Sequence, residues 1–164
     1  MVGEIEKKPE LGVSGSIDVR KGLLQLEEAW KSEDGHSIGD DWVDRVEGGG
    51  LEHQFMNGLY VRMVHLPKGM FFTTKIHKVR HPYFVLHGKC RIFTEEGVVD
   101  MIAPHHGITE PGTKRLMYIV EDVVWYTVHA TDKTTPEEVE EEVIAKDYGE
   151  FKMEQEDLKK LKGN

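Results

Sequence analysis

The sequence contains a single cysteine, Cys90, in 164 residues. One cysteine cannot form an intramolecular disulfide, so the class of small secreted domains that disulfides hold together is excluded. Zinc sites of the Cys-x-x-Cys kind are excluded for the same reason. Cys90 alternates with Ile92 in a strand-like run, which is typical of a small, buried apolar side chain.

Long apolar runs are also missing. No stretch approaches the roughly 20 apolar residues that a membrane-spanning helix requires. Residues 1–11 are charged and lack the apolar segment of a secretory signal. The sequence therefore predicts a cytoplasmic protein with no membrane partner.

Positive charge is in deficit. The chain has 21 Lys and Arg against 30 Asp and Glu, which gives a formal net charge of −9. This average field disfavours nonspecific binding to nucleic acid or to an anionic membrane surface. We therefore expect no nucleic acid partner. Glycine-rich phosphate loops and dinucleotide fingerprints are absent too.

Two polar zones flank a central one. Residues 1–50 hold few apolar runs and predict a partly ordered N-terminal arm with one amphipathic helix around 23–30. Residues 132–164 predict an acidic helical tail. A capping box with proline at the first helical position, Thr135-Pro136-Glu137-Glu138, indicates where this helix begins.

Residues 51–131 are dense in β-forming residues and are divided by turn residues. Eight short strands at close spacing, with no helical pattern between them, indicate a sandwich, jelly roll or small barrel. Because sheet edges have to be paired or covered, we also expect a homodimer formed through these sheets. The predicted strands are 58–66, 70–77, 83–87, 89–94, 98–102, 108–110, 115–120 and 123–130.

Histidine is concentrated in the central zone, where eight of the nine histidines lie. Neutral imidazoles that converge inside a barrel suit Fe, Mn, Ni or Zn. The eight are His53, His65, His77, His81, His87, His105, His106 and His129.

The stretch 67–88 resembles the first motif of the cupin superfamily, which has a glycine, a His-x-His pair, a glutamate and a second glycine. Counting back from Gly88 places Lys75 at the first histidine, His77 at the second and His81 at the glutamate. The resemblance implies an all-β fold, a cupin-type double-stranded β-helix barrel, with a metal centre inside it. Lys75 departs from the pattern, because a protonated lysine cannot ligate a metal, although it can bind a substrate carboxylate.

Strand geometry favours His77 and His81 as a pair of ligands. Residues 75 and 77 point to the same face of one strand, and the turn that follows brings residue 81 alongside. Both imidazoles are therefore expected to face the inside of the barrel.

His129 is the third predicted ligand. It directly follows the apolar run 123–128 and lies on the same face of the strand as Trp125 and Thr127. A polar ring that is buried there needs a partner. His53, which precedes the first predicted strand, is a weaker candidate.

The second cupin motif is matched only in part. Its proline is Pro104, but Thr109 stands at the position of its histidine, so the usual fourth ligand of the family is absent. Thr109 is predicted instead, together with Lys75, to contact a substrate. His105 and His106 fall in a loop-like segment, where exposure to solvent is expected.

Two functional classes follow. In the first, His77, His81 and His129 hold a divalent Fe, Mn, Ni or Zn ion, and a small molecule bound in the barrel undergoes the reaction of a dioxygenase, lyase or isomerase. In the second, the chain is a noncatalytic structural or assembly protein. Its barrel is then a packing and oligomerisation module, and its histidines are structural or interfacial. A fold of this kind does not decide between them.

A narrower resemblance concerns the β core, about half of the chain. Its segments look like small cupin-like proteins of unknown role that tailed bacteriophages encode, which implies the fold more than any reaction. For a phage-encoded protein, the second class becomes a phage structural or assembly protein, located in the host cytoplasm or in the virion. The segments are 58–62, 67–69, 77–81, 111–115 and 121–125.

Overall fold

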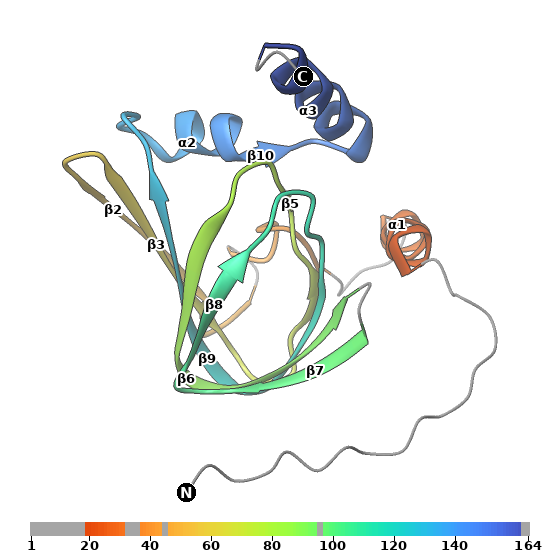
Figure 1. The fold of residues 1–164 in the computed structure, drawn as a ribbon. Coiled ribbons are helices and arrows are strands. Elements are labelled where there is room, and N and C mark those ends of the chain that lie inside the picture. Colours follow the sequence, from red (N-terminus) through yellow and green to blue (C-terminus); the bar gives the residue numbers. More distant parts are fainter. Residues whose placement is uncertain (1–18, 32–36, 44–45, 95–96, 162–164) are drawn as a thin grey trace, which may run out of the picture.

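The computed structural model describes residues 19–31, 37–43, 46–94 and 97–161. Nearly half of them form strands, which curl into a barrel, with helices outside it and across one end (Figure 1). The predicted all-β class is confirmed. Among the described residues, no helix combines the length and the apolar character needed to cross a membrane. In chain order the elements are α1 (Val19–Trp30), β1 (Ser37–Ile38), β2 (Gly50–Met56), β3 (Leu59–Leu66), β4 (Phe71–Thr73), β5 (Ile76–His77), β6 (His81–Thr94), β7 (Gly97–Ile102), β8 (His105–Thr109), β9 (Leu116–Ala130), α2 (Pro136–Val143), β10 (Ile144–Ala145) and α3 (Tyr148–Leu161).

One eight-stranded sheet forms the barrel wall, and β9 lies at its centre. β9 pairs antiparallel with β3, β4 and β6, and β6 pairs in turn with β7 and β8. The strands β6 and β9 are 14 and 15 residues long. Each is therefore long enough to run through two walls of the barrel.

A bulge at Gly88 bends β6 against β9. The register between the two strands shifts between Val85 and Cys90. Gly88 has a φ of 84°, and a Cβ at this position would lie 1.8 Å from the carbonyl oxygen of Asp122. Glycine is thus required for the two backbones to approach so closely. The prediction of separate strands on either side of residues 88 and 121–122 was wrong, because these residues bend two continuous strands.

Two further assignments differ from the sequence prediction. β2 was not predicted, because its residues show no clear apolar alternation and the last five are exposed; His53 therefore lies on a strand and not before the first one. His105 and His106 lie on β8 and not in a loop, although both are exposed as expected.

The core fills the barrel with side chains from both walls. Val85, Cys90 and Ile119 are fully buried there, which confirms the interpretation of Cys90 as a buried small residue. Trp42 joins the same core with 1% of its surface exposed. The segment that carries Trp42 was assigned to the N-terminal arm, yet it completes the interior of the barrel.

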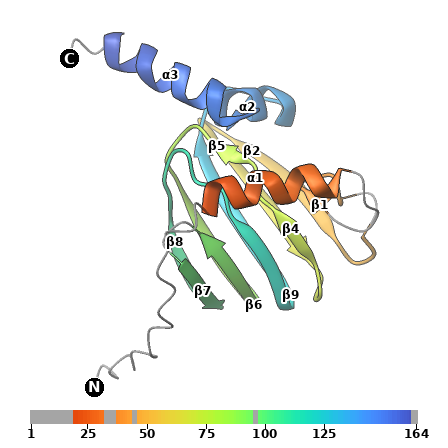
Figure 2. The same cartoon turned by 90° about the vertical axis from the view of Figure 1, so that its right-hand side faces the viewer.

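Helix α1 lies against the outside of the sheet (Figure 2). The carboxylate of Glu27 lies 2.6 Å from the ammonium of Lys114, and the two side chains are 12% and 6% exposed. The hydroxyl of Thr73 on β4 donates a hydrogen bond to the same carboxylate, and Trp30 packs edge-on against Phe71. A buried ion pair therefore fixes this helix to the barrel.

The C-terminal segment crosses one end of the barrel (Figure 1). Helix α2 begins where the capping box predicts, because the Thr135 side chain accepts a hydrogen bond from the Glu138 N–H. Val139 and Val143 of this helix are buried and pack with Tyr60 of β3. β10 then pairs with β5, so this segment is part of the barrel mouth.

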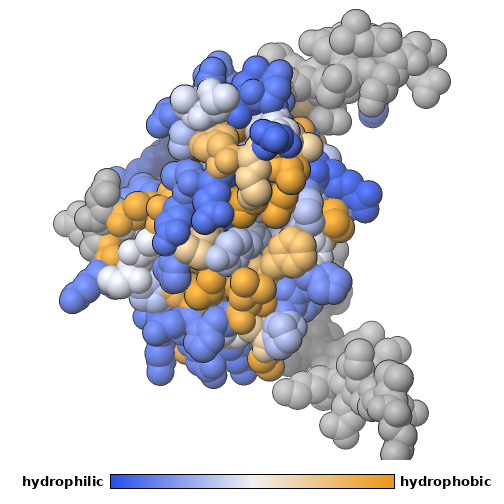
Figure 3. All heavy atoms as spheres, turned by 90° about the vertical axis from the view of Figure 1, so that its left-hand side faces the viewer, coloured by the Kyte–Doolittle hydropathy of each residue, from blue (hydrophilic) through white to orange (hydrophobic). Residues whose placement is uncertain are grey.

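The outer face of β2, β3, β9, β6 and β8 carries many apolar side chains (Figure 3). Pairing places Met63 beside Tyr126 and Tyr126 beside Phe84. Nearby, Leu86 and Ile108 are 59% and 46% exposed. Apolar faces of this kind are typical of interaction sites, and the homodimer expected from the sequence stays a prediction.

Replacing Glu27 should weaken the protein strongly. Glu27→Ala leaves the Lys114 ammonium buried without its carboxylate, and losing one partner of a buried pair costs about 3–5 kcal/mol. Urea unfolding followed by circular dichroism measures this loss. Glu28→Ala is the matched control, because the neighbouring Glu28 pairs with Lys31 at the surface and should change little. Equal losses in both variants would contradict a buried anchor at Glu27.

Candidate functional site

Three strands bring His77, His81 and His129 to the inside of the barrel near its mouth. Tyr83 of β6 pairs with Thr127 of β9, and because side chains on one face recur every second residue, His81 and His129 face inward one step further along. His77 comes from β5, where it pairs with Ile144 of β10.

The three imidazoles lie side by side, and His81 adjoins both of the others. The ring centroids of His77 and His81 are 4.3 Å apart, and those of His81 and His129 are 4.2 Å apart. The centroids of His77 and His129 are separated by 6.2 Å. His81 and His129 are 2% and 4% exposed. The residues predicted as ligands thus form one cluster, called the histidine cluster below, and their role as metal ligands stays a prediction.

Burial keeps the histidine cluster neutral. Burial, reinforced by His81 and His129, holds the pKa of His77 well below its ordinary value. Burial also lowers the pKa of His81. The hydrogen bond to the carbonyl of Val79 acts in the opposite direction but is the smaller effect. Burial, then His81 and Arg62, lower the pKa of His129 to about 3. Each ring therefore has one N–H donor and one free lone pair at neutral pH.

The chemistry of the cluster suits a metal, but its geometry does not. Neutral imidazoles are metal ligands. The Nδ1 of His81 lies 3.1 Å from the carbonyl oxygen of Val79, and donation to this oxygen leaves the lone pair on Nε2 free. This arrangement is common in metal-ligating histidines. However, within the described ranges no group of three or more His, Cys, Asp or Glu side chains is placed so that it could hold a metal ion.

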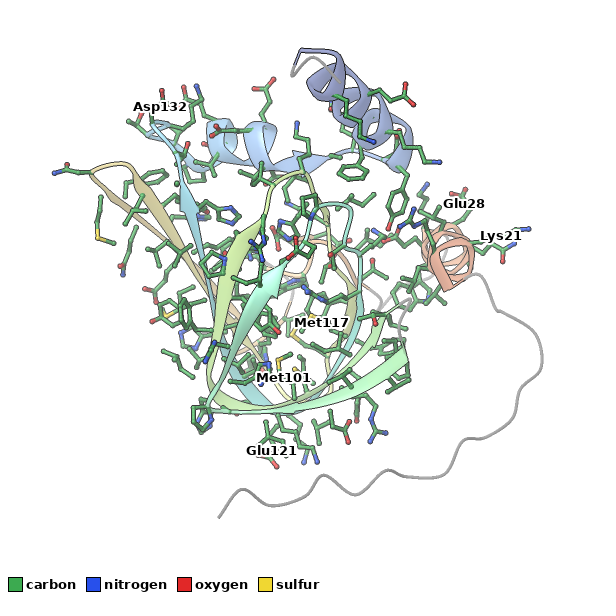
Figure 4. All side chains as sticks on the ribbon, in the orientation of Figure 1. Lys21, Glu28, Met101, Met117, Glu121 and Asp132 are labelled. Atoms are coloured by element: carbon green, nitrogen blue, oxygen red, sulfur yellow. The ribbon has the colours of Figure 1, made fainter. Side chains whose placement is uncertain are left out.

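The histidine cluster lines a cavity of about 340 Å³ that runs from the barrel interior to α2. Its inner part is apolar, with Trp42, Leu66 and Met117 among its walls, and Figure 4 shows Met117 inside the barrel. Its outer part is bounded by residues of α2 such as Val139. The C-terminal segment therefore closes the cavity on one side.

Unpartnered polar atoms gather around this cavity. In the part of the chain that the structure describes, five buried side-chain nitrogen or oxygen atoms lack a hydrogen-bond partner. All five belong to residues that line the cavity. Such atoms are rare in folded proteins and each calls for a physical explanation, such as a ligand, an ion or a water molecule. They are Trp42 Nε1, His77 Nδ1, His81 Nε2, Thr127 Oγ1 and His129 Nδ1.

Charged side chains line the mouth of the cavity. Lys75, a predicted substrate-binding residue, pairs there with Asp40 and with Glu140 of α2. Arg62 of β3 pairs with the same Asp40. Sequence reasoning missed Arg62, although a signal exists: it alternates with Tyr60 and Val64, so it is a cation on the inward face of a strand.

Thr109, the other predicted substrate-binding residue, lies beside the cluster. It is 1% exposed, pairs with His81 across β6 and β8, and lines the cavity. Its hydroxyl lies 3.3 Å from a guanidinium nitrogen of Arg115, which donates to it. Thr109 thus has a partner, in contrast to Thr127.

Four further histidines lie outside the cluster. His53 lines the rim of the cavity, where its Nδ1 lies 2.6 Å from the hydroxyl oxygen of Tyr60. His105 Nε2 lies 3.3 Å from the hydroxyl oxygen of Tyr83. His87 and His106 are exposed. None of these four joins the three clustered rings.

The sequence matches no known protein-family model and no curated protein. Solved structures that resemble the chain include the cupin domain of Cnp3 from Schizosaccharomyces pombe, at 18% identity and a TM-score of 0.45, over 53% of this chain and 67% of that one. A cupin superfamily protein from Desulfitobacterium hafniense has 9% identity and a TM-score of 0.45, over 54% of this chain and 82% of that one.

A third similar structure is an RmlC-like cupin family protein with a double-stranded β-helix fold from Methanocaldococcus jannaschii. It has 11% identity and a TM-score of 0.45, over 53% of this chain and 84% of that one. These values transfer no activity, ligand or partner to the chain. The resemblance to phage-encoded proteins stays a prediction.

Acid should destabilise the protein through the histidine cluster. The folded-state pKa of His129 lies below the ordinary value of 6.5, so below pH 6.5 the unfolded chain binds protons that the folded protein does not. Each such histidine removes about 1.4 kcal/mol per pH unit from the free energy of unfolding. Urea unfolding at pH 7, 6 and 5 in the presence of chelator measures this slope.

His129→Gln should make the free energy of unfolding fall less steeply between pH 6 and pH 5. The reduction corresponds to the one proton that His129 takes up when the wild-type protein unfolds. His87→Gln is the control, because His87 is exposed on the same sheet, and it should keep the wild-type slope. A His129→Gln variant with the wild-type slope would contradict a buried, neutral His129.

Proposed function

We propose that the protein binds a small molecule in the barrel cavity, with the histidine cluster as its polar centre. The observation that supports this most is the convergence of the five unpartnered polar atoms on one cavity. Leaving a buried polar group without a partner costs about 1–3 kcal/mol. A ligand that supplies those hydrogen bonds recovers this free energy when it binds.

The cavity defines the kind of molecule that fits. A volume of about 340 Å³ lies at the lower end of the range for small-molecule sites. The indole nitrogen of Trp42 is a donor only, so it needs an acceptor, whereas neutral imidazoles and the Thr127 hydroxyl both donate and accept. A compact ligand with an apolar body and one or more oxygen acceptors satisfies these groups.

A divalent metal on His77, His81 and His129 is the second candidate. The observation that favours it is that each of these three neutral rings has a buried nitrogen without a partner. A bound metal would act as a Lewis acid on a ligand oxygen. Because the side chains as placed do not have the geometry of a metal site, we assign no reaction step to it.

Ligand binding should be visible at the indole of Trp42. Titrating the protein with small carboxylic acids and alcohols should shift the Trp42 indole resonance in ¹H–¹⁵N spectra, because this N–H gains an acceptor. Trp30 is the internal control, since it packs against Phe71 outside the barrel and should not move. If no compound shifts Trp42 selectively, the proposed binding function is wrong.

Thr127→Val sharpens the same experiment. In the ligand-free protein it should raise the free energy of unfolding by about 1 kcal/mol, because it removes an unpartnered buried hydroxyl, and it should weaken ligand binding. Thr109→Val is the matched control and should lower stability, because it breaks the bond to Arg115. A loss of stability in both variants would contradict an unsatisfied hydroxyl at residue 127.

The metal candidate is tested by thermal unfolding with chelator and with added Fe, Mn, Ni or Zn. If a metal binds the folded state and not the unfolded state, a free metal concentration 100-fold above the Kd adds about 2.7 kcal/mol to the free energy of unfolding. His77→Ala, His81→Ala and His129→Ala should lose this response, and exposed His87→Ala should keep it. The response should fade as pH drops, because ligation requires neutral imidazole. A wild-type melting temperature indifferent to metal and chelator would exclude this candidate.

A further inference from the structure

Lys75 connects two carboxylates from distant parts of the chain at the cavity mouth. Its ammonium lies 2.9 Å from Oδ2 of Asp40, which follows β1, and 2.6 Å from Oε1 of Glu140 on α2. All three residues line the cavity. The cation that the sequence assigns to a substrate carboxylate is thus already held by two carboxylates of the protein itself.

The two carboxylates are bound unequally. Asp40 is 26% exposed and is shared between Lys75 and Arg62. Although burial raises the pKa of Asp40, the charges of Arg62 and Lys75 hold it below its ordinary value. The Glu140 side chain is 52% exposed, and ion pairs of such exposed groups contribute little. Asp40 is the fixed partner of Lys75, and Glu140 is the replaceable one.

The Lys75 side chain is held in place independently of Glu140. Its stem packs on the backbone of Gly39, where a Cβ would lie 3.0 Å from both Cγ and Cε of Lys75. Gly39 itself has a φ of 62°, and its N–H donates to the carbonyl of Thr73 at 2.8 Å. The ammonium therefore stays directed at the mouth when Glu140 leaves.

Helix α2 also stays attached without Glu140. The ammonium of Lys78 donates to the carbonyl of Glu141 at 2.7 Å, and Thr131 bonds to Glu142 at 2.5 Å. The pairing of β10 with β5 holds the end of the helix. Movement of the Glu140 side chain alone is thus enough to free one position on Lys75.

We propose that Glu140 occupies the position of a ligand carboxylate in the ligand-free protein, and that a small carboxylic acid bound in the cavity replaces it on Lys75. This inference rests on the proposed binding function and names the ligand class. The exchange leaves Lys75 with two carboxylates and returns a half-exposed Glu140 to solvent. The apolar inner part of the cavity receives the body of the acid.

The test is isothermal titration with benzoate and with its uncharged isostere benzamide, at constant ionic strength. Glu140→Gln should bind benzoate at least fivefold more tightly than wild type and should bind benzamide with unchanged affinity. Glu141→Gln is the matched control, with the same charge change one residue along α2, and should stay within twofold of wild type for both. Lys75→Met should lose the preference for benzoate over benzamide.

Each outcome decides the proposal. An equal gain for Glu140→Gln and Glu141→Gln would reduce the effect to overall charge and overturn it. Benzamide binding that shifts Trp42, with no gain for benzoate in Glu140→Gln, would overturn it while the proposed binding function stands. If neither compound binds any variant and Trp42 does not shift, both fail together. Circular dichroism and melting temperature confirm that each variant is folded.

Discussion

The pairing of β6 with β9 through the bend at Gly88 is the constraint on which the site depends. On one side of the bend the two strands contribute core residues such as Ile92 and Met117. On the other side of the bend, the inward-facing residues of the two strands include His81 and His129. Because side chains alternate with period two, a slip of one residue in either strand would turn the imidazole of that strand to the outer face. The backbone contact that only glycine permits therefore fixes where the polar side chains lie.

The interior of the barrel combines two opposed environments. Deep in it, fully buried Val85 and Ile119 are typical of a packed core. Nearer the mouth, one nitrogen of each clustered imidazole and a buried hydroxyl lack hydrogen-bond partners. Such groups lower stability unless something binds them, and proteins commonly accept this cost where function requires it. Their restriction to one cavity is the physical reason to regard it as a binding site.

The mouth of the cavity joins elements that are remote in sequence. Asp40 comes from the N-terminal segment, Lys75 from the connection between β4 and β5, and Glu140 from α2. β10 reinforces the junction because it pairs with the strand that carries His77. The acidic tail is thus part of the site, although its composition alone is typical of a solvated helix.

The sequence by itself determined the all-β class and the start of α2, because each depends on local spacing: turn residues and a capping box. It also pointed to the three histidines that cluster, through the resemblance of residues 67–88 to the first cupin motif and the period-two alternation of strands. It also indicated the burial of Cys90. Only the tertiary structure decided that residues 88 and 121–122 bend strands instead of ending them, since this depends on the approach of two backbones. It alone placed Trp42 in the core and brought Asp40, Arg62 and Glu140 to Lys75, because contacts between side chains so far apart in sequence form only once the barrel has closed.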